Sequence, residues 1–107
     1  MTETEFLTLS GALLARIEEA VEAAGVDADI ERKGEGILEL EFDNGSKIVV
    51  NSQTPMRQIW VAAKSGGFHF ENREGAWLDT RSGEALAETL SRVITEQSGE
   101  RVRFTLA

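Results

Sequence analysis

The spacing of apolar residues changes abruptly along this chain, and this change limits the fold more than any other feature of the sequence. Between residues 3 and 24 apolar side chains recur at steps of three and four, at Phe6, Leu9, Leu13, Ile17, Ala20, Val21 and Ala24. This period predicts an amphipathic helix that ends near Gly25. After Gly25 the period becomes two, which is typical of half-buried strands. The chain must therefore join a helix to a sheet.

The middle of the chain predicts an antiparallel meander. Residues 27–32 and 38–43 alternate between apolar and polar side chains. The tetrapeptide that starts at Asp43 and continues Asn-Gly-Ser predicts a hairpin with a tight primed turn, because Asn and Gly tolerate positive φ. Further strands are expected over residues 47–51 and 57–64, followed by two short ones. The inner faces of the strands over residues 47–51 and 57–64 are predicted to carry Ile48, Val50, Ile59, Val61 and Ala63.

A second amphipathic helix is expected near the C-terminus. Ser82 can cap it, Glu84 lies in its first turn and Gly99 ends it. Its apolar stripe consists of Leu86, Leu90, Val93 and Ile94, and an alternating tail follows with Val102, Phe104 and Leu106. The pattern predicts an α+β fold in one domain over residues 1–107. It is a two-layer sandwich with an antiparallel sheet of about five to seven strands and both helices on one face.

The charge is concentrated in the first part of the chain. The net charge is −8, but residues 1–44 contain twelve Asp and Glu against three Lys and Arg, which makes that part −9. Such a field attracts cations and basic protein surfaces and repels nucleic acid and anionic lipid. We therefore expect no nucleic-acid partner and no membrane partner.

Composition also restricts the chemistry. The chain has no cysteine and one histidine, so thiolate sites are excluded and a Ser/His/Asp triad has little to build from. We interpret His69, between two phenylalanines on a strand, as structural or surface-exposed. The acidic N-terminus and the lack of a long apolar run favour a bacterial cytoplasmic protein without a targeting segment. The protein is not expected to be an enzyme.

Six carboxylates around Gly25 form the first candidate site, which we call the acidic ridge: Glu18, Glu19, Glu22, Asp27, Asp29 and Glu31. The spacing does not match a calcium loop, because Arg32 occupies the position of the required glycine and Leu38 that of the bidentate glutamate. Three interpretations remain: a weak site for hard cations such as Fe³⁺ or Mg²⁺, a docking surface for a basic protein, or a solvated acidic face. The residues Ala23 to Gly25 divide the ridge into a helical cluster and a strand cluster.

The second candidate site is on the outer face of the sheet. Alternation places Trp60 outward, on the side opposite the expected helices, with Gln58 and Asn51 nearby. An outward tryptophan on a wet sheet face is typical of a protein-binding hot spot. Trp77, in contrast, is interpreted as structural.

These residues are part of a wider resemblance. The run NGSKIVVNSQTPMRQIWVAAKSGGFHF, from Asn44 to Phe70, followed by Trp77, Asp79 and Arg81-Ser82-Gly83-Glu84, resembles the bacterial, CyaY-type branch of the frataxin family over essentially the whole chain. The resemblance implies a sandwich with the order helix, sheet, helix. It also implies weak binding of iron, as Fe²⁺ or Fe³⁺, to the acidic ridge, with other divalent cations possible.

The resemblance further implies a role in iron–sulfur cluster assembly, as a regulator or iron supplier that binds the IscS-type cysteine desulfurase and the iron–sulfur scaffold complex. The partner-binding residues would be Trp60, Asn51 and Gln58 on the sheet, with Glu18, Glu19 and Glu22 on the ridge. The protein would be a monomer, with iron-dependent oligomers as an option. Two alternatives stay open: ferroxidase or iron-storage activity at the same carboxylates, and an interaction module that is indifferent to metal.

Overall fold

The first helix matches the predicted span. The computed structural model describes residues 1–103 and 105–106, and in it α1 runs over Glu3–Ala23. Thr2 begins the helix with a capping box, in which the Glu5 N–H donates to the Thr2 hydroxyl over 3.1 Å and the Thr2 N–H donates to the Glu5 carboxylate over 3.0 Å. Gly25 follows the helix with φ of 71°, as expected of a C-terminal stop. Leu9 departs from prediction, because it is 41% exposed while Leu14 is buried.

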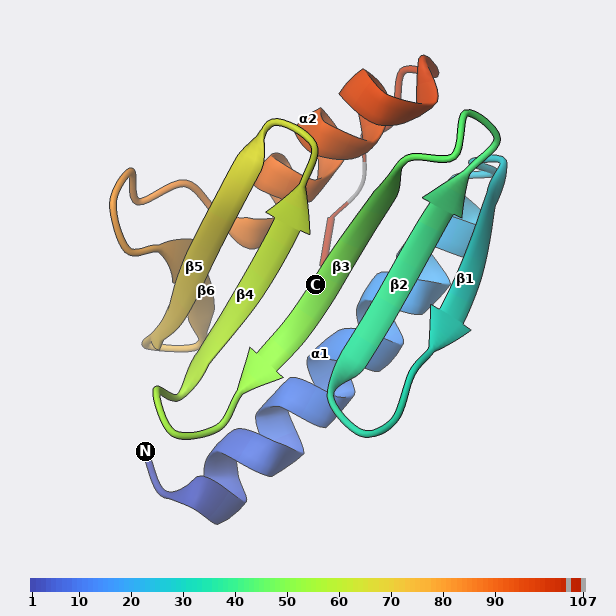
Figure 1. The fold of residues 1–107 in the computed structure, drawn as a ribbon. Helices are drawn as coiled ribbons and strands as arrows, with labels where there is room; N and C mark the ends of the chain where they lie inside the picture. Colours follow the sequence, from blue (N-terminus) through green and yellow to red (C-terminus); the bar gives the residue numbers. More distant parts are fainter. Residues whose placement is uncertain (104, 107) are drawn as a thin grey trace.

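Six strands form one antiparallel sheet, which confirms the predicted α+β sandwich. The strands are β1 (Ala28–Arg32), β2 (Ile37–Phe42), β3 (Lys47–Gln53), β4 (Gln58–Ala63), β5 (Gly66–Arg73) and β6 (Ala76–Asp79). Their order in the sheet is the order in the chain, so β1 and β6 are the two edges. Figure 1 shows both helices on one face of the sheet, which leaves the other face open.

The alternating residues meet the helices as the sequence predicts. Ile48 and Val50 of β3 and Ile59 and Val61 of β4 are buried in the same apolar cluster as the inner residues of α1. Trp77 of β6 is also buried in it. The full set of buried apolar side chains is Phe6, Leu13, Leu14, Ile17, Val21, Leu38, Leu40, Phe42, Ile48, Val50, Ile59, Val61, Phe70, Trp77, Leu86, Leu90, Val93, Ile94 and Val102.

The turn between β2 and β3 is of a different type from the predicted one. Only Gly45 has positive φ in this turn, and Asn44 does not, so the loop is not a primed turn. The Asn44 side chain explains this difference: its oxygen accepts the N–H of Ser46 over 2.9 Å, and its amide donates to the carbonyl of Gln97 over 2.7 Å. A positive-φ pair occurs instead at Glu74 and Gly75, between β5 and β6.

The second helix, α2, spans Leu86–Ser98, and its N-cap is Ala85, three residues after the predicted cap Ser82. Ser82 does not cap it. Its hydroxyl oxygen accepts the N–H of Glu84 over 3.1 Å, and Ala85 pairs with Leu78 in an isolated β-bridge that keeps the chain extended. Gly99 ends the helix with φ of 77°, as predicted.

Gln97 joins the end of α2 to two hairpin turns. It is only 6% exposed. Its side-chain oxygen accepts the N–H of Lys64 over 2.9 Å, and its side-chain amide donates to the carbonyl of Lys47 over 3.1 Å. A polar residue on a helix face therefore fixes the helix on the sheet with no unpaired group of its own.

The tail after α2 returns over the helices. Val102 is buried and is fixed to Thr95, whose hydroxyl oxygen accepts the Val102 N–H over 2.9 Å. Leu106 packs against the apolar cluster, whereas the predicted contribution of Phe104 lies outside the described residues. In the described part of the chain no helix is long and apolar enough to cross a membrane.

Candidate functional site

The helical half of the acidic ridge lies on the outer side of α1. Glu19 and Glu22 are exposed, and Glu18 is partly exposed. Glu18 has a partner that the sequence did not indicate, because its carboxylate lies 3.4 Å from the Arg32 guanidinium of β1. This ion pair links the helical half of the ridge to the edge strand. It also neutralises one of the three helical charges.

The strand half of the ridge lies at the edge of the sheet. This position is the one that a surface shared by the carboxylates of α1 and β1 needs. Asp27 directly precedes β1, and Asp29 and Glu31 are exposed on it. The register pairs Asp29 with Glu41 and Glu31 with Glu39 on the neighbouring strand. Like charges directly opposite each other in a sheet are destabilising, so the edge carries more negative charge than folding favours.

Lysines compensate only part of this charge. Lys33 lies 3.2 Å from Glu39 and 3.9 Å from Glu31, and Lys47 lies 3.4 Å from Glu39. The hydrogen bond to Glu39 is the main reason why the pKa of Lys33 is raised. Within the described residues no ion pair involves Asp29 or Glu41, so these two carboxylates face solvent and each other.

Two further carboxylates join the ridge where β1 begins. Asp43, from the turn after β2, has a raised pKa, because its carboxyl shares a hydrogen bond with Asp27 and also feels the negative charges of Asp27, Asp29 and Glu100. Glu100, just after α2, accepts the backbone N–H of Asp27 over 3.4 Å. Sequence reasoning left both residues out of the site. The register of the β1–β2 hairpin, which pairs Ala28 with Phe42, would have placed Asp43 beside Asp27. The position of Glu100, in contrast, depends on tertiary packing.

The ridge is not a preformed chelate. Across residues 1–103 and 105–106 no three His, Cys, Asp or Glu side chains are arranged to hold a metal ion. Exposed carboxylate oxygens attract hard cations, but they bind weakly and with little selectivity when they are not held in place. The geometry therefore suits loosely bound, exchangeable cations and basic protein side chains alike.

The outer face of the sheet carries a row of polar and aromatic residues. Asn51, Trp60 and His69 lie side by side on β3, β4 and β5. The rings of Trp60 and His69 are stacked, with centroids 4.2 Å apart and planes at 9°. The Trp60 N–H donates to the Gln58 side chain over 2.8 Å. We call Asn51, Gln58, Trp60 and His69 the aromatic platform.

Trp60 is less exposed than its outward position suggested, because His69 covers one face of its indole. The stack and the bond to Gln58 hold the ring in one orientation, so it can contact another protein without losing much side-chain entropy. His69 was predicted only as a structural or surface residue. Period-two alternation places His69 on the same outer face as residues 58, 60 and 62, but its position beside Trp60 depends on the register between β4 and β5.

Comparisons with known proteins agree with this architecture. A family model described as a frataxin-like domain matches residues 1–100. The chain is 58% identical over 101 residues to the iron-sulfur cluster assembly protein CyaY of Ralstonia nicotianae, with 92% of this chain and 89% of the relative covered. It is 54% identical over 101 residues to the protein of the same name from Cupriavidus pinatubonensis, with 92% and 91% covered.

Two solved structures are similar as well. Frataxin from Psychromonas ingrahamii matches with a TM-score of 0.90 and 39% identity, and the match covers 98% of this chain and 99% of that one. Trimeric frataxin from the yeast Saccharomyces cerevisiae, complexed with ferrous iron, matches with a TM-score of 0.63 and 31% identity over 82% of this chain and 80% of that one. The family model, the curated relatives and the shared fold lead to one conclusion: the chain belongs to the frataxin family.

Proposed function

We propose that this protein is an iron-binding accessory protein of iron–sulfur cluster assembly, which docks on the cysteine desulfurase through its acidic ridge and modulates that enzyme. The main support is the placement of the ridge at the open edge of the sheet. There the two halves of the ridge are linked by Glu18 and Arg32, and acids face acids between β1 and β2. The role of the relatives named CyaY and the ferrous complex of the yeast neighbour support the same proposal.

Repulsion within the ridge gives the proposal its physical basis. Carboxylates that repel one another in the free protein bind a cation or an arginine-rich surface more favourably, because binding relieves the repulsion. Iron bound in this way is cargo, held through single carboxylates and water. This fits a protein that delivers or senses iron better than one that stores it.

An anaerobic titration with Fe²⁺, followed by amide NMR signals, tests the iron part of the proposal. We expect perturbations at residues 18–31 and also near Asp43 and Glu100. Amides near Glu88 and Glu96, which are exposed carboxylates on α2, serve as the internal control. Perturbations of equal size near the α2 acids would refute a specific role for the ridge.

Binding to the purified desulfurase tests the partner part. We expect Glu19→Lys with Glu22→Lys to weaken binding strongly, and the matched change of Glu88→Lys with Glu96→Lys on α2 to leave it nearly unchanged. Both pairs change the net charge equally, so an equal loss in the two would mean that total charge matters and the ridge does not. Cluster-assembly rates with and without the protein, measured across iron concentrations, then give the sign of the regulation.

A ferroxidase is the second candidate, since Fe²⁺ oxidation at carboxylates needs no other residue type. The exposure of the ridge and the lack of a preformed three-ligand set within the described residues weigh against it, because metal catalysis needs fixed ligands. Oxygen consumption above that of iron alone would favour this candidate. A metal-indifferent interaction module is the third, and it requires desulfurase affinity to stay constant when iron is added.

A further inference from the structure

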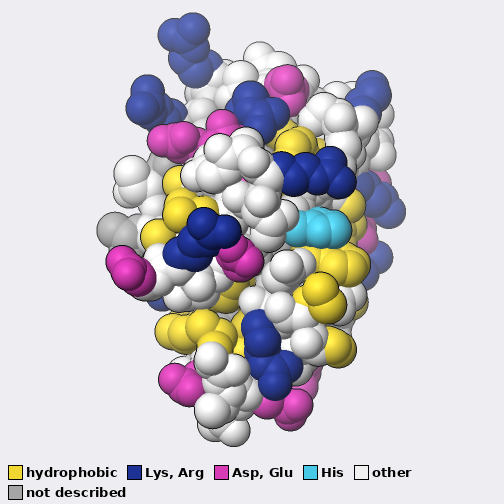
Figure 2. Space-filling model, turned by 90° about the vertical axis from the view of Figure 1, so that its left-hand side faces the viewer, with side chains coloured by type: hydrophobic (Ala, Val, Ile, Leu, Met, Phe, Trp, Pro, Cys, Tyr) yellow, Lys and Arg dark blue, Asp and Glu magenta, His cyan; other side chains and the backbone are white. Residues whose placement is uncertain are grey.

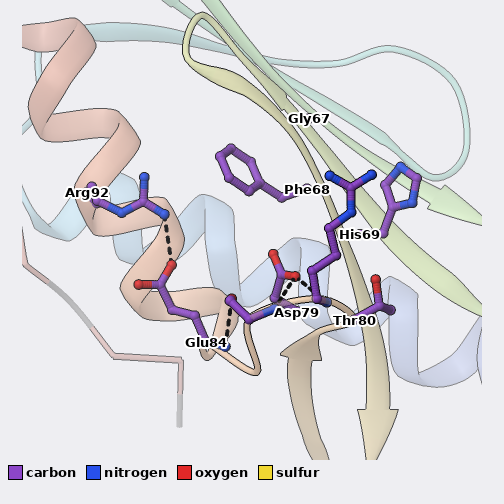
Figure 3. Close-up of a pocket in the computed structure, with 9 residues that line it drawn as sticks. Gly67, Phe68, His69, Asp79, Thr80, Glu84 and Arg92 are labelled. Carbon is purple, nitrogen blue, oxygen red and sulfur yellow. Dashed lines mark hydrogen bonds and ion pairs between the residues drawn. The ribbon is translucent and has the colours of Figure 1, made fainter.

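A cavity lies near the sheet edge opposite the acidic ridge. It measures about 300 Å³ and opens between β5, the loop from β6 to α2, and α2 itself (Figure 3). The residues that matter for its chemistry are Phe68, His69, Asp79, Arg81, Ser82, Glu84 and Arg92. In Figure 2, which shows this side of the molecule, Lys and Arg side chains lie beside the single histidine. Arg81 and Arg92 balance Asp79 and Glu84, so the lining of the cavity has no net formal charge, in a chain whose net charge is −8.

The two acids in the cavity are already engaged by the fold. Asp79 accepts the backbone N–H groups of Arg81 and Ser82 over 2.7 and 3.1 Å. Glu84 accepts the Thr89 hydroxyl and, over 2.8 Å, the guanidinium of Arg92. These two bonds, with that of Thr89 the larger, lower the pKa of Glu84, so it stays ionised and paired.

The hydrogen-bond donors in the cavity are not matched in the same way. A guanidinium has five N–H groups, and Arg92 uses one of them on Glu84. Within the residues that the structure describes, the side chain of Arg81 donates no hydrogen bond. The Ser82 hydroxyl oxygen accepts the Glu84 N–H, so its own proton is free to be donated. Within the residues that the structure describes, the lining therefore has more unpaired donors than carboxylate oxygens, and a ligand that supplies acceptors matches it.

Arg92 is also held in position before any ligand arrives. Its guanidinium carbon lies 5.5 Å from the centre of the Phe68 ring, which is the geometry of a cation–π contact. The contact with Phe68 and the hydrogen bond to Glu84 together hold the guanidinium in place. A ligand oxyanion would thus meet a donor group whose side-chain entropy has already been lost.

His69 makes the cavity continuous with the aromatic platform. One face of its ring stacks on Trp60, and the same residue lines the cavity. A protein that covers Trp60 and His69 therefore reaches the rim of the cavity. This continuity favours an anion that belongs to the docked protein over a free one.

We propose that the cavity is an anion subsite of the docking face, which takes an Asp or Glu carboxylate of the assembly protein that covers Trp60. The inference rests on the proposed function for the identity of that partner. In the complex, the ridge binds a basic surface while the cavity binds an acidic side chain. Two contacts of opposite sign at opposite edges of the sheet fix the orientation of the docked protein.

The anion site is tested first without any partner. Malonate, a dicarboxylate, is titrated into the full chain at constant ionic strength, and amide NMR signals are followed. We expect saturable shifts at residues 67–69 and 80–82, which Arg81→Ala removes and Arg103→Ala, an exposed arginine on the tail, leaves intact. Shifts that are absent, or equally large in Arg81→Ala, would overturn the proposal.

The partner is tested with the purified complex of desulfurase and scaffold. We expect Arg81→Glu to lower the affinity about tenfold or more, because it places like charges together, and Arg103→Glu to lower it less than twofold. Arg81→Lys should retain part of the affinity. A malonate response without any effect of Arg81→Glu on the complex would overturn the docking role. If the wild-type chain does not bind the complex at all, the proposed function is refuted. The malonate titration still tests the anion site independently.

Discussion

Glu22 offers the sharpest test of the idea that the acidic ridge costs stability. It is exposed in the last turn of α1, one turn after Glu18, and that turn contains no basic residue. The carbonyl end of a helix is partially negative, so a glutamate there is unfavourable and a lysine is favourable. We predict that Glu22→Lys makes the protein more stable. Glu18 is kept because it forms the ion pair with Arg32.

The magnitude follows from two surface effects. A like-charge pair one helical turn apart costs about 0.2 to 0.5 kcal/mol, and its replacement by an opposite pair gains about as much again. A cation in place of an anion at the helix end adds about 0.3 to 1 kcal/mol. The sum is about 1 kcal/mol, which corresponds to a rise of about 4 °C in Tm for a domain of this size.

The assay is thermal unfolding at low salt and again at 0.5 M sodium chloride, combined with desulfurase binding. Glu96→Lys is the control, since Glu96 is exposed in the last turn of α2 and the change in net charge is the same. Its gain should be smaller, because the new lysine stands one turn after Arg92. We expect Glu22→Lys alone to weaken binding. A Tm that does not rise at low salt, or a rise that persists undiminished at 0.5 M salt, would refute the electrostatic argument.

Three other predictions concern stability. Gln97→Ala should lower the free energy of unfolding by about 2 to 3 kcal/mol, because it removes two hydrogen bonds between α2 and the hairpin turns; urea unfolding measures this, and a loss under 0.5 kcal/mol would contradict it. Asp43→Asn should raise Tm at pH 7. The raised pKa of Asp43 means that its protonated form is favoured in the folded state. The stabilising contribution of protonated Asp43 is therefore fully present below its ordinary pKa of 3.8, and it is lost as the pH rises through the raised pKa. The difference between variant and wild type should therefore disappear below about pH 4, and a constant difference across pH would contradict the cause. Glu74→Asn should stabilise by about 0.5 to 1 kcal/mol, because Glu74 has φ of 53° and asparagine tolerates this conformation better; an unchanged Tm would show that the turn is not strained.

Side-chain period predicted the layers of this fold because one face of each element is buried. The start of α2 could not be predicted in the same way. Ser82 and Glu84 form a good capping signal, but Asp79 accepts two backbone N–H groups just before it, and the bridge between Leu78 and Ala85 extends the chain further. Local side-chain bonds and one tertiary bridge compete with the cap, and they delay the helix to Leu86.

The candidate sites show the same division. The sequence predicted that Trp60 points outward, since alternation alone decides it, but the stack with His69 depends on the register between β4 and β5. The spacing of apolar side chains also predicted that the carboxylates of the helix and of the strand lie on exposed faces. The approach of Glu100 to Asp27 joins residues 73 positions apart, and no local pattern reports a contact at that distance.

The open edge at β1 has a consequence for self-association. An edge strand has unpaired backbone groups that can recruit a strand from another copy, and charged side chains on that strand oppose it. In this protein the opposing charges are Asp29 and Glu31, which also belong to the acidic ridge. Any cation that neutralises them lowers the barrier to edge pairing. If copies of this chain pair through β1, cation occupancy and assembly state would be thermodynamically linked, and each would shift the midpoint of the other.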